Sequence, residues 1–201
     1  MFFVGAGLPQ IAALAGNAKS YAERLFNYPE VGQLDPVAAR AALVLPARNE
    51  QADFDPDAVE EILRLTERYP YFIQEWGFHV WNSAAKSPIR RADVDQATPG
   101  VIAHLDTNFF RVRFDRLTPL QQKYLRAMAE LGPGPHQTGE IASTLGVEAK
   151  DVATVRQQLI NKGMVWNQRH GETAFTVPMF SEFMKRQMLI LERHLPKRRF
   201  R

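Results

Sequence analysis

Apolar residues recur at helical spacing over most of the first 115 residues. In the segment 56–69 the apolar positions 58, 59, 62 and 63 form one stripe, and in 101–114 they stand at 101, 102, 105, 109, 110 and 112. Positions three and four residues apart lie on one face of an α-helix. The pattern therefore predicts a compact helical bundle over residues 8–115.

The same part of the chain carries repeated signals for the start of a helix. Asp35-Pro36 and Asp55-Pro56 each place a capping carboxylate before a proline in the first helical position. Residues 71–84 are apolar on most faces, which predicts a buried central helix. Pro99 either kinks a helix or starts another. The apolar run at residues 2–4 predicts a strand that lacks a partner in this chain.

The pattern changes after residue 117. Thr118 and Pro119 start a helix, Gly132–Pro135 interrupts it, and helices follow at 138–145, with Thr138 as cap, and at 150–162. Residues 164–168 and 173–177 form two strands joined by a turn at Gly171, and a last helix begins at Pro178. This order is typical of a winged helix-turn-helix. The predicted fold class is therefore mainly α, a helical bundle followed by a winged helix-turn-helix with a small β-hairpin wing.

The helix at 150–162 has one apolar face and one polar face. Val152, Val155 and Leu159 face the core, and Arg156 lies at its flank. The opposite side chains are hydrogen-bonding groups that reach base edges or phosphates in DNA complexes. With the ends of the motif and the tip of the wing, the candidate DNA-binding residues are Thr138, Lys150, Thr154, Gln157, Asn161, Lys162, Arg169 and His170.

The charge is distributed unevenly along the chain. Residues 1–117 hold 12 basic and 15 acidic side chains, whereas residues 118–201 hold 13 basic and 7 acidic ones. The second part therefore carries a net charge of +6, which favours a polyanion such as duplex DNA as partner. Two alternatives remain open: a solvated basic surface, and a winged helix that docks on another protein or on its own chain as an autoinhibitory module.

Several stretches resemble the C-terminal part of AAA+ ATPases of the archaeal and STAND type, which are broadly similar to origin-recognition-type initiators. They include FFVGAGLP, FDPDAVEEILRLTERYPYFIQEWG and LDTNFFRVRFDRLTPLQQKYLRAMAEL. The resemblance implies that residues 1–7 are a remnant of the ATPase core, 8–117 a helical lid and 118–201 the winged helix. It also implies that Tyr69, Pro70 and Tyr71 lie against a bound nucleotide and sense its state.

The chain departs from that family in its catalytic motifs. It has no G-x-x-x-x-G-K-[ST] loop and no apolar strand ending in paired acidic residues, so this chain alone is not expected to hydrolyse ATP. No arginine is evident in the sensor-two role, with Arg68 as the one guess. We expect no cofactor in this chain. The resemblance implies ATP or ADP with Mg²⁺ for a full-length ATPase, and the N-terminal ATPase core, a further copy or another protein as partner.

Other chemistry finds little support in the sequence. The five histidines are scattered, without H-E-x-x-H, so no metal site and no catalytic residue is predicted. There is no cysteine, which excludes disulfides and cysteine metal sites. The apolar opening lacks a basic n-region and is broken by Gly5, Gly7 and Pro9. We therefore expect a cytoplasmic protein with no membrane partner.

Overall fold

The structure is a computed structural model of the chain. It describes residues 4–5, 7, 11–19, 21, 25–29, 32–167 and 171–192. Its contacts divide the chain into two units, Met1–Gly32 and Gln33–Arg201. In the first unit α1 spans Ile11–Ala18. The strand expected at 2–4 falls largely outside the described residues.

The second unit contains helices and a small antiparallel sheet. In chain order its elements are α3 (Pro36–Asn49), α4 (Pro56–Leu65), α5 (Pro70–Ser83), α6 (Arg91–Leu105), η1 (Asp106–Phe110), α7 (Arg111–Phe114), α8 (Pro119–Leu131), β1 (His136–Gln137), α9 (Thr138–Leu145), α10 (Ala149–Asn161), β2 (Val165–Trp166), β3 (Glu172–Phe175) and α11 (Phe180–Glu192).

The predicted helix starts are confirmed. The Asp35 carboxylate accepts hydrogen bonds from the backbone N–H groups of Val37 and Ala38, both at 2.9 Å, and Pro36 is the first helical residue. Pro56 begins α4 and Pro70 begins α5 in the same position. A proline costs nothing there, because the first N–H of a helix has no partner within it. Asp55 occupies the cap position of α4, but its side chain accepts no capping hydrogen bond, so the expected carboxylate cap is wrong there.

Helix α5 is less buried than its composition predicts. Phe72, Ile73, Trp76 and Val80 are buried, but Phe78 is 65% exposed. Trp76 fixes the rotation of the helix, because its indole Nε1 donates to Thr98 Oγ1 of α6 at 3.1 Å. The expectation of a helix buried on most faces is therefore wrong, since α5 packs against its neighbours on one side.

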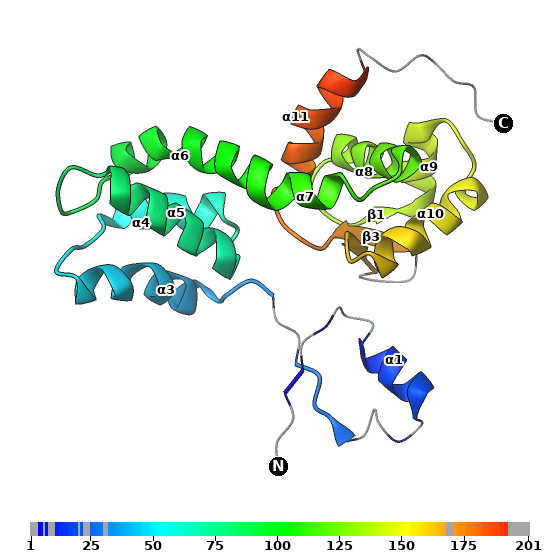
Figure 1. Ribbon diagram of the computed structural model, residues 1–201, viewed down its shortest axis with the longest axis horizontal. Helices are drawn as coiled ribbons and strands as arrows, with labels where there is room; N and C mark the ends of the chain where they lie inside the picture. The colour runs from blue at the N-terminus through cyan, green and yellow to red at the C-terminus, as the bar shows by residue number, and fades with distance from the viewer. Residues whose placement is uncertain are drawn as a thin grey trace. The chain divides into compact units, whose positions relative to one another are not determined.

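One nearly continuous helical run joins the two parts of this unit. It comprises α6, the π-helical segment η1 and α7, and it passes through Pro99 without starting a new element. Figure 1 shows α4 and α5 beside α6 and the winged helix beyond α7. A π-helical turn inserts one extra residue per turn, which rotates the following side chains. Phe110 is buried within this segment.

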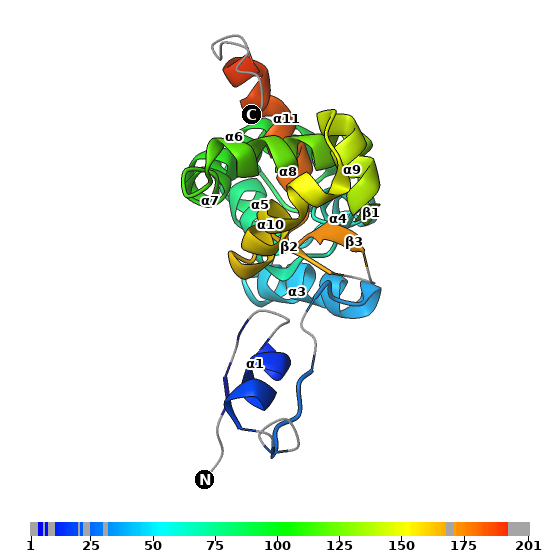
Figure 2. The same cartoon turned by 90° about the vertical axis from the view of Figure 1, so that its right-hand side faces the viewer.

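The second part of the fold has the element order predicted for a winged helix-turn-helix, with helices around a small three-stranded antiparallel sheet. Strand β3 lies between β1 and β2, with His136 opposite Thr173 and Val165 opposite Phe175. Figure 2 shows this sheet beside α9 and α10. Gly146 and Gly163 directly follow the helices predicted at 138–145 and 150–162. Their φ values of 70° and 68° place both in the left-handed backbone region that favours glycine. The apolar spine that the sequence predicts for the two helices is largely buried: Ile141, Ala142, Val152, Val155, Leu159 and Ile160 are buried, and Leu145 is partly buried against the core.

Helix α11 ties the winged helix to the long helical run. It begins two residues later than predicted, at Phe180, and packs on α8 and η1. The Phe183 ring lies 5.3 Å from that of Phe110 and 5.8 Å from that of Phe114. Beside these rings Arg186 forms a two-pronged ion pair with Asp106, at 2.6 and 2.8 Å. Buried side chains on both sides of residue 117 form one continuous core. The domain boundary expected there therefore stays a prediction.

Replacing Phe183 by alanine tests this junction. The side chain is fully buried, so Phe183→Ala should lower the free energy of unfolding by about 3–5 kcal/mol through lost burial and the cavity left behind. Chemical denaturation followed by circular dichroism measures the change. Leu189→Ala on the same helix is the control, because Leu189 is 59% exposed and its loss should change stability little.

Candidate functional site

Helix α10 presents the polar face that the sequence predicts. Lys150, Thr154, Gln157 and Asn161 are all exposed, while the apolar side chains of the helix are buried. Gln157 Nε2 donates to Asn161 Oδ1 at 3.0 Å, so these two amides lie side by side one turn apart. An exposed helix face with free amide and hydroxyl groups can form hydrogen bonds to base edges in a major groove.

The N-terminal end of this face is acidic. Lys150 Nζ lies 2.6 Å from Glu148 Oε2, and both side chains are more than two-thirds exposed. Asp151 accepts a hydrogen bond from the Glu148 backbone N–H at 3.1 Å and so caps the helix. An exposed ion pair contributes about 0–1 kcal/mol, so Lys150 can leave Glu148 at little cost to meet a phosphate. The two carboxylates nevertheless reduce the positive potential at this end.

Lys162 and Thr138 are engaged within the protein. Lys162 Nζ donates to the Arg116 carbonyl at 2.6 Å and to Gln121 Oε1 at 2.8 Å, so it holds the end of α10 against the start of α8. Thr138 does not cap α9 as expected. It is the first residue of that helix, Gln137 occupies the cap position, and the Thr138 hydroxyl donates to the Gly171 carbonyl. Both side chains thus have structural partners.

Arg156 holds the wing against α10. Its Nε donates to Thr173 Oγ1 at 2.8 Å, and its Nη2 donates to Asn167 Oδ1 and to the Glu172 carbonyl. These three acceptors lie on β3 and next to β2, so the guanidinium sets the position of both strands. The candidates at the wing tip, Arg169 and His170, lie outside the described residues.

The positive charge of the second part is not spread over the winged helix. In the described ranges 118–167 and 171–192 the basic and acidic side chains are equal in number. The excess of six comes from Arg169 and from five cations in residues 193–201, namely Arg193, Lys197, Arg198, Arg199 and Arg201. The net positive charge of the second part is therefore concentrated at Arg169 and in residues 193–201.

In the helical part, Tyr69, Pro70 and Tyr71 form the start of α5. Tyr69 occupies the cap position and Pro70 the first helical one. The Tyr71 ring stacks on Phe109 at 4.9 Å, and the Arg113 guanidinium lies 3.8 Å from the centre of the same Phe109 ring. Burial raises the pKa of the Tyr71 hydroxyl, and its hydrogen bond to Glu75 raises that pKa further. Tyr69, whose ring contacts Phe72, and Tyr71 thus belong to an aromatic cluster of the protein itself.

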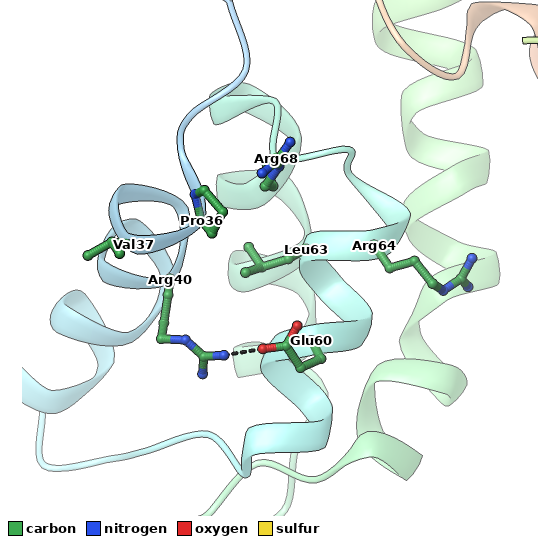
Figure 3. Close-up of a pocket in the computed structure, with 7 residues that line it drawn as sticks. All are labelled: Pro36, Val37, Arg40, Glu60, Leu63, Arg64 and Arg68. Carbon is green, nitrogen blue, oxygen red and sulfur yellow. Dashed lines mark hydrogen bonds and ion pairs between the residues drawn. The ribbon is translucent and has the colours of Figure 1, made fainter.

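A separate pocket of about 440 Å³ opens between α3 and α4 (Figure 3). Its charged lining comprises Arg40, Glu60, Arg64 and Arg68. Arg40 pairs with Glu60, whereas Arg64 points away toward its partner Glu61. Arg68 bonds only weakly to Gln33, at 3.5 Å. The pocket can therefore accept an anionic group at Arg68, but Tyr69, Pro70 and Tyr71 are not part of its lining.

Two histidines that look scattered in the sequence lie together in the fold. His79 Nε2 is 3.8 Å and His104 Nε2 is 3.6 Å from the same Glu75 oxygen, and the three potential ligand atoms lie within 4.8 Å of one another. The spacing of Glu75 and His79, one helical turn apart, was the one sequence signal for this cluster. His104 comes from α6 and gave no such signal.

Comparisons with known proteins give a partial match. The family described as "Domain of unknown function (DUF8462)" matches residues 107–184, from η1 into α11. No curated protein matches significantly. A variant of Thermotoga maritima RuvB is similar over 90% of this chain and 57% of its own, at 16% identity and a TM-score of 0.41. The "Thermotoga maritima RuvB Holliday junction branch migration motor" is similar over 93% and 65%, at 14% identity and a TM-score of 0.37.

The chain spans between half and two thirds of the length of these solved structures. At such identities and TM-scores, the likeness carries no conclusion about activity. Among the described residues, no helix combines the length and apolar composition that crossing a bilayer requires.

Arg156→Ala should loosen the wing. It removes three hydrogen bonds and leaves the fully buried Thr173 hydroxyl without this donor, so we expect a loss of about 1–3 kcal/mol in the free energy of unfolding. Urea denaturation measures the loss. The neighbouring Gln157→Ala variant serves as control and should stay within about 0.5 kcal/mol of the parent. Equal stability of the two variants would contradict the role of Arg156.

Glu61 should make stability depend on pH. Hydrogen bonds from Arg64, followed by the charges of Arg64 and Arg91, hold the pKa of this buried carboxyl below its ordinary value of 4.5. A lowered folded-state pKa stabilises the protein above pH 4.5, and the contribution disappears as pH falls below that value. Because both arginines are largely exposed, we expect about 1 kcal/mol.

The test compares Glu61→Gln with the exposed neighbour Glu60→Gln at pH 6 and pH 3. Glu61→Gln should be less stable than the parent at pH 6, and the gap should narrow at pH 3. Glu60→Gln should show a smaller gap at both values. A Glu61→Gln gap that stays constant with pH would refute the assignment.

Proposed function

We propose that this chain is the C-terminal regulatory part of an AAA+ or STAND-like ATPase, and that its winged helix binds duplex DNA. The observation that carries the proposal is the exposed, mainly uncharged polar face of α10, in a helical unit with a small hairpin. Arg156 and Lys162, the cations flanking that face, are held by the protein, so Thr154, Gln157 and Asn161 remain available for bases. The resemblance of the sequence to the ATPase family supports the wider context.

In this proposal, the residues that attract the DNA phosphates differ from those that contact the bases. Arg169 and the cations of residues 193–201 supply the attraction to phosphates, because the rest of the winged helix is electrically balanced. Lys150 supports them once it leaves Glu148. Residues 8–117 act as the lid, with Tyr69, Pro70 and Tyr71 at the helix start that senses ATP or ADP on the preceding core. Nucleotide and Mg²⁺ would be held by that core.

A docking module is the second candidate function. The acidic end of α10, with Glu148 and Asp151, favours it, since carboxylates at the usual base-reading end repel phosphate. In that case the face of α10 would meet a protein, such as the ATPase core or a further copy of the chain.

Fluorescence anisotropy with random duplex DNA at 50 and 200 mM salt separates the two functions. DNA binding should weaken about tenfold or more over this range if several phosphates are contacted. The double variant Lys150→Glu with Arg169→Glu should weaken binding strongly and flatten the salt dependence. The control reverses two lysines outside the winged helix, Lys19→Glu with Lys86→Glu, and should change binding less.

A variant chain that ends at residue 192 tests whether the cations of residues 193–201 supply the attraction to DNA. Losing five cations should reduce both the affinity and its dependence on salt, while the fold persists. Absence of binding by the parent chain at low salt would sink the DNA proposal and favour docking. Unchanged binding by the Lys150/Arg169 variant would place the DNA contact elsewhere on the chain.

A further inference from the structure

We propose that Glu75, His79 and His104 form a binding site for a divalent transition-metal ion, with Zn²⁺ as the preferred occupant. The three side chains offer one carboxylate oxygen and two imidazole nitrogens, all within 4.8 Å of one another. Two imidazoles and a carboxylate are a donor set that suits Zn²⁺ and its transition-metal neighbours, whereas Mg²⁺ and Ca²⁺ prefer oxygen ligands.

The distances are close to those of a coordinated ion. Zinc ligands that stand about 2.0–2.2 Å from the ion in a tetrahedron are roughly 3.3–3.5 Å apart. The Glu75 oxygen lies 3.6 Å from His104 Nε2 and 3.8 Å from His79 Nε2. The Glu75 oxygen therefore needs to approach each imidazole nitrogen by only a few tenths of an ångström. The two imidazole nitrogens lie within 4.8 Å of each other, and rotation of the two histidine side chains can bring them closer.

The ligands stand on rigid elements. Glu75 and His79 are one turn apart on α5, so they share one face of that helix. His104 lies on α6 next to Leu105, which is fully buried, and Glu75 lies next to Trp76, which is also fully buried. The bond from Trp76 to Thr98 holds the two helices in register. A bound ion would join α5 to α6 by a second link.

Neighbouring polar groups can orient the ligands. Asn108 lies one turn beyond His104, with its amide nitrogen 3.1 Å from His104 Nδ1. A half-turn of that amide presents its oxygen to an Nδ1–H, which leaves His104 Nε2 as the free donor for the metal. The Tyr71 hydroxyl also interacts with Glu75. Metal-ligating side chains commonly have such outer partners.

The site is accessible from solvent. The side chain of Glu75 is 20% exposed, that of His79 29% and that of His104 41%. An ion can enter without opening the core, and three protein ligands leave a coordination position for water or for a group of a partner. The exposure also means that replacing either histidine should leave the fold intact.

Isothermal titration calorimetry of the full chain with Zn²⁺ alone tests the proposal. We expect one saturable site, no comparable signal with Mg²⁺, and a loss of affinity of about tenfold or more in His79→Gln and in His104→Gln. His194→Gln is the matched control: it removes an imidazole far away in the sequence and should retain the site. Glu75→Gln keeps the shape of the side chain and should also weaken binding.

Thermal unfolding by circular dichroism provides the second readout. Zn²⁺ should raise the Tm of the parent and of His194→Gln, but not that of His79→Gln or His104→Gln, because only binding to the folded state stabilises it. The same spectra show whether each variant is folded. No saturable binding by the parent, or equal binding by folded His79→Gln, His104→Gln and Glu75→Gln variants, would overturn the proposal.

Discussion

The packing of phenylalanine rings around the π-helical segment is the interaction on which the larger unit depends. Phe110 lies in η1, and the rings of Phe72, Phe180 and Phe183 surround it at 5.3–5.9 Å. These rings come from α5 and α11, so one buried side chain contacts both the helical part and the winged helix. The Asp106–Arg186 ion pair lies beside these rings. Its paired hydrogen bonds require a defined geometry, so they fix the orientation of α11 against η1 more narrowly than the burial of apolar rings does. The winged helix is therefore a fixed continuation of the helical part.

The surface of the winged helix divides its polar groups between two tasks. Arg156, Lys162 and Thr138 hold α10, α8, α9 and the wing in position, whereas Thr154, Gln157 and Asn161 remain exposed. The residues with hydrogen-bond partners inside the protein lie where one helix or strand contacts another. A cation at such a contact stabilises the fold by bonding to carbonyl oxygens, and it then contributes less to attracting an outside partner. Basic and acidic side chains are balanced in the described winged helix, so the net positive charge of residues 118–201 comes from Arg169 and residues 193–201.

Local features of the sequence predicted much of the fold. Asp35 before Pro36, the turn glycines Gly146 and Gly163, and the apolar spine of the helix-turn-helix each depend on neighbours within a few residues, and each was confirmed. The partners of Lys162, Arg156 and His104 could not be predicted in this way. Lys162 bonds to Arg116 and Gln121, more than 40 residues away, so its role depends on how whole helices pack. The burial of α5 also depends on how whole helices pack. Phe78 is exposed because of which elements cover that helix, and the apolar composition of α5 does not predict this.

The run from Arg91 to Phe114 also has a mechanical consequence. At 1.5 Å per residue it is about 36 Å long, and it is clamped to the winged helix at one end and to α4 and α5 at the other. It can therefore act as a lever arm: a tilt of about 10° of the helical part would carry α10 through about 6 Å. This displacement is larger than one helical turn of about 5.4 Å, so a modest reorientation of the helical part would move the exposed face of α10 by more than one turn.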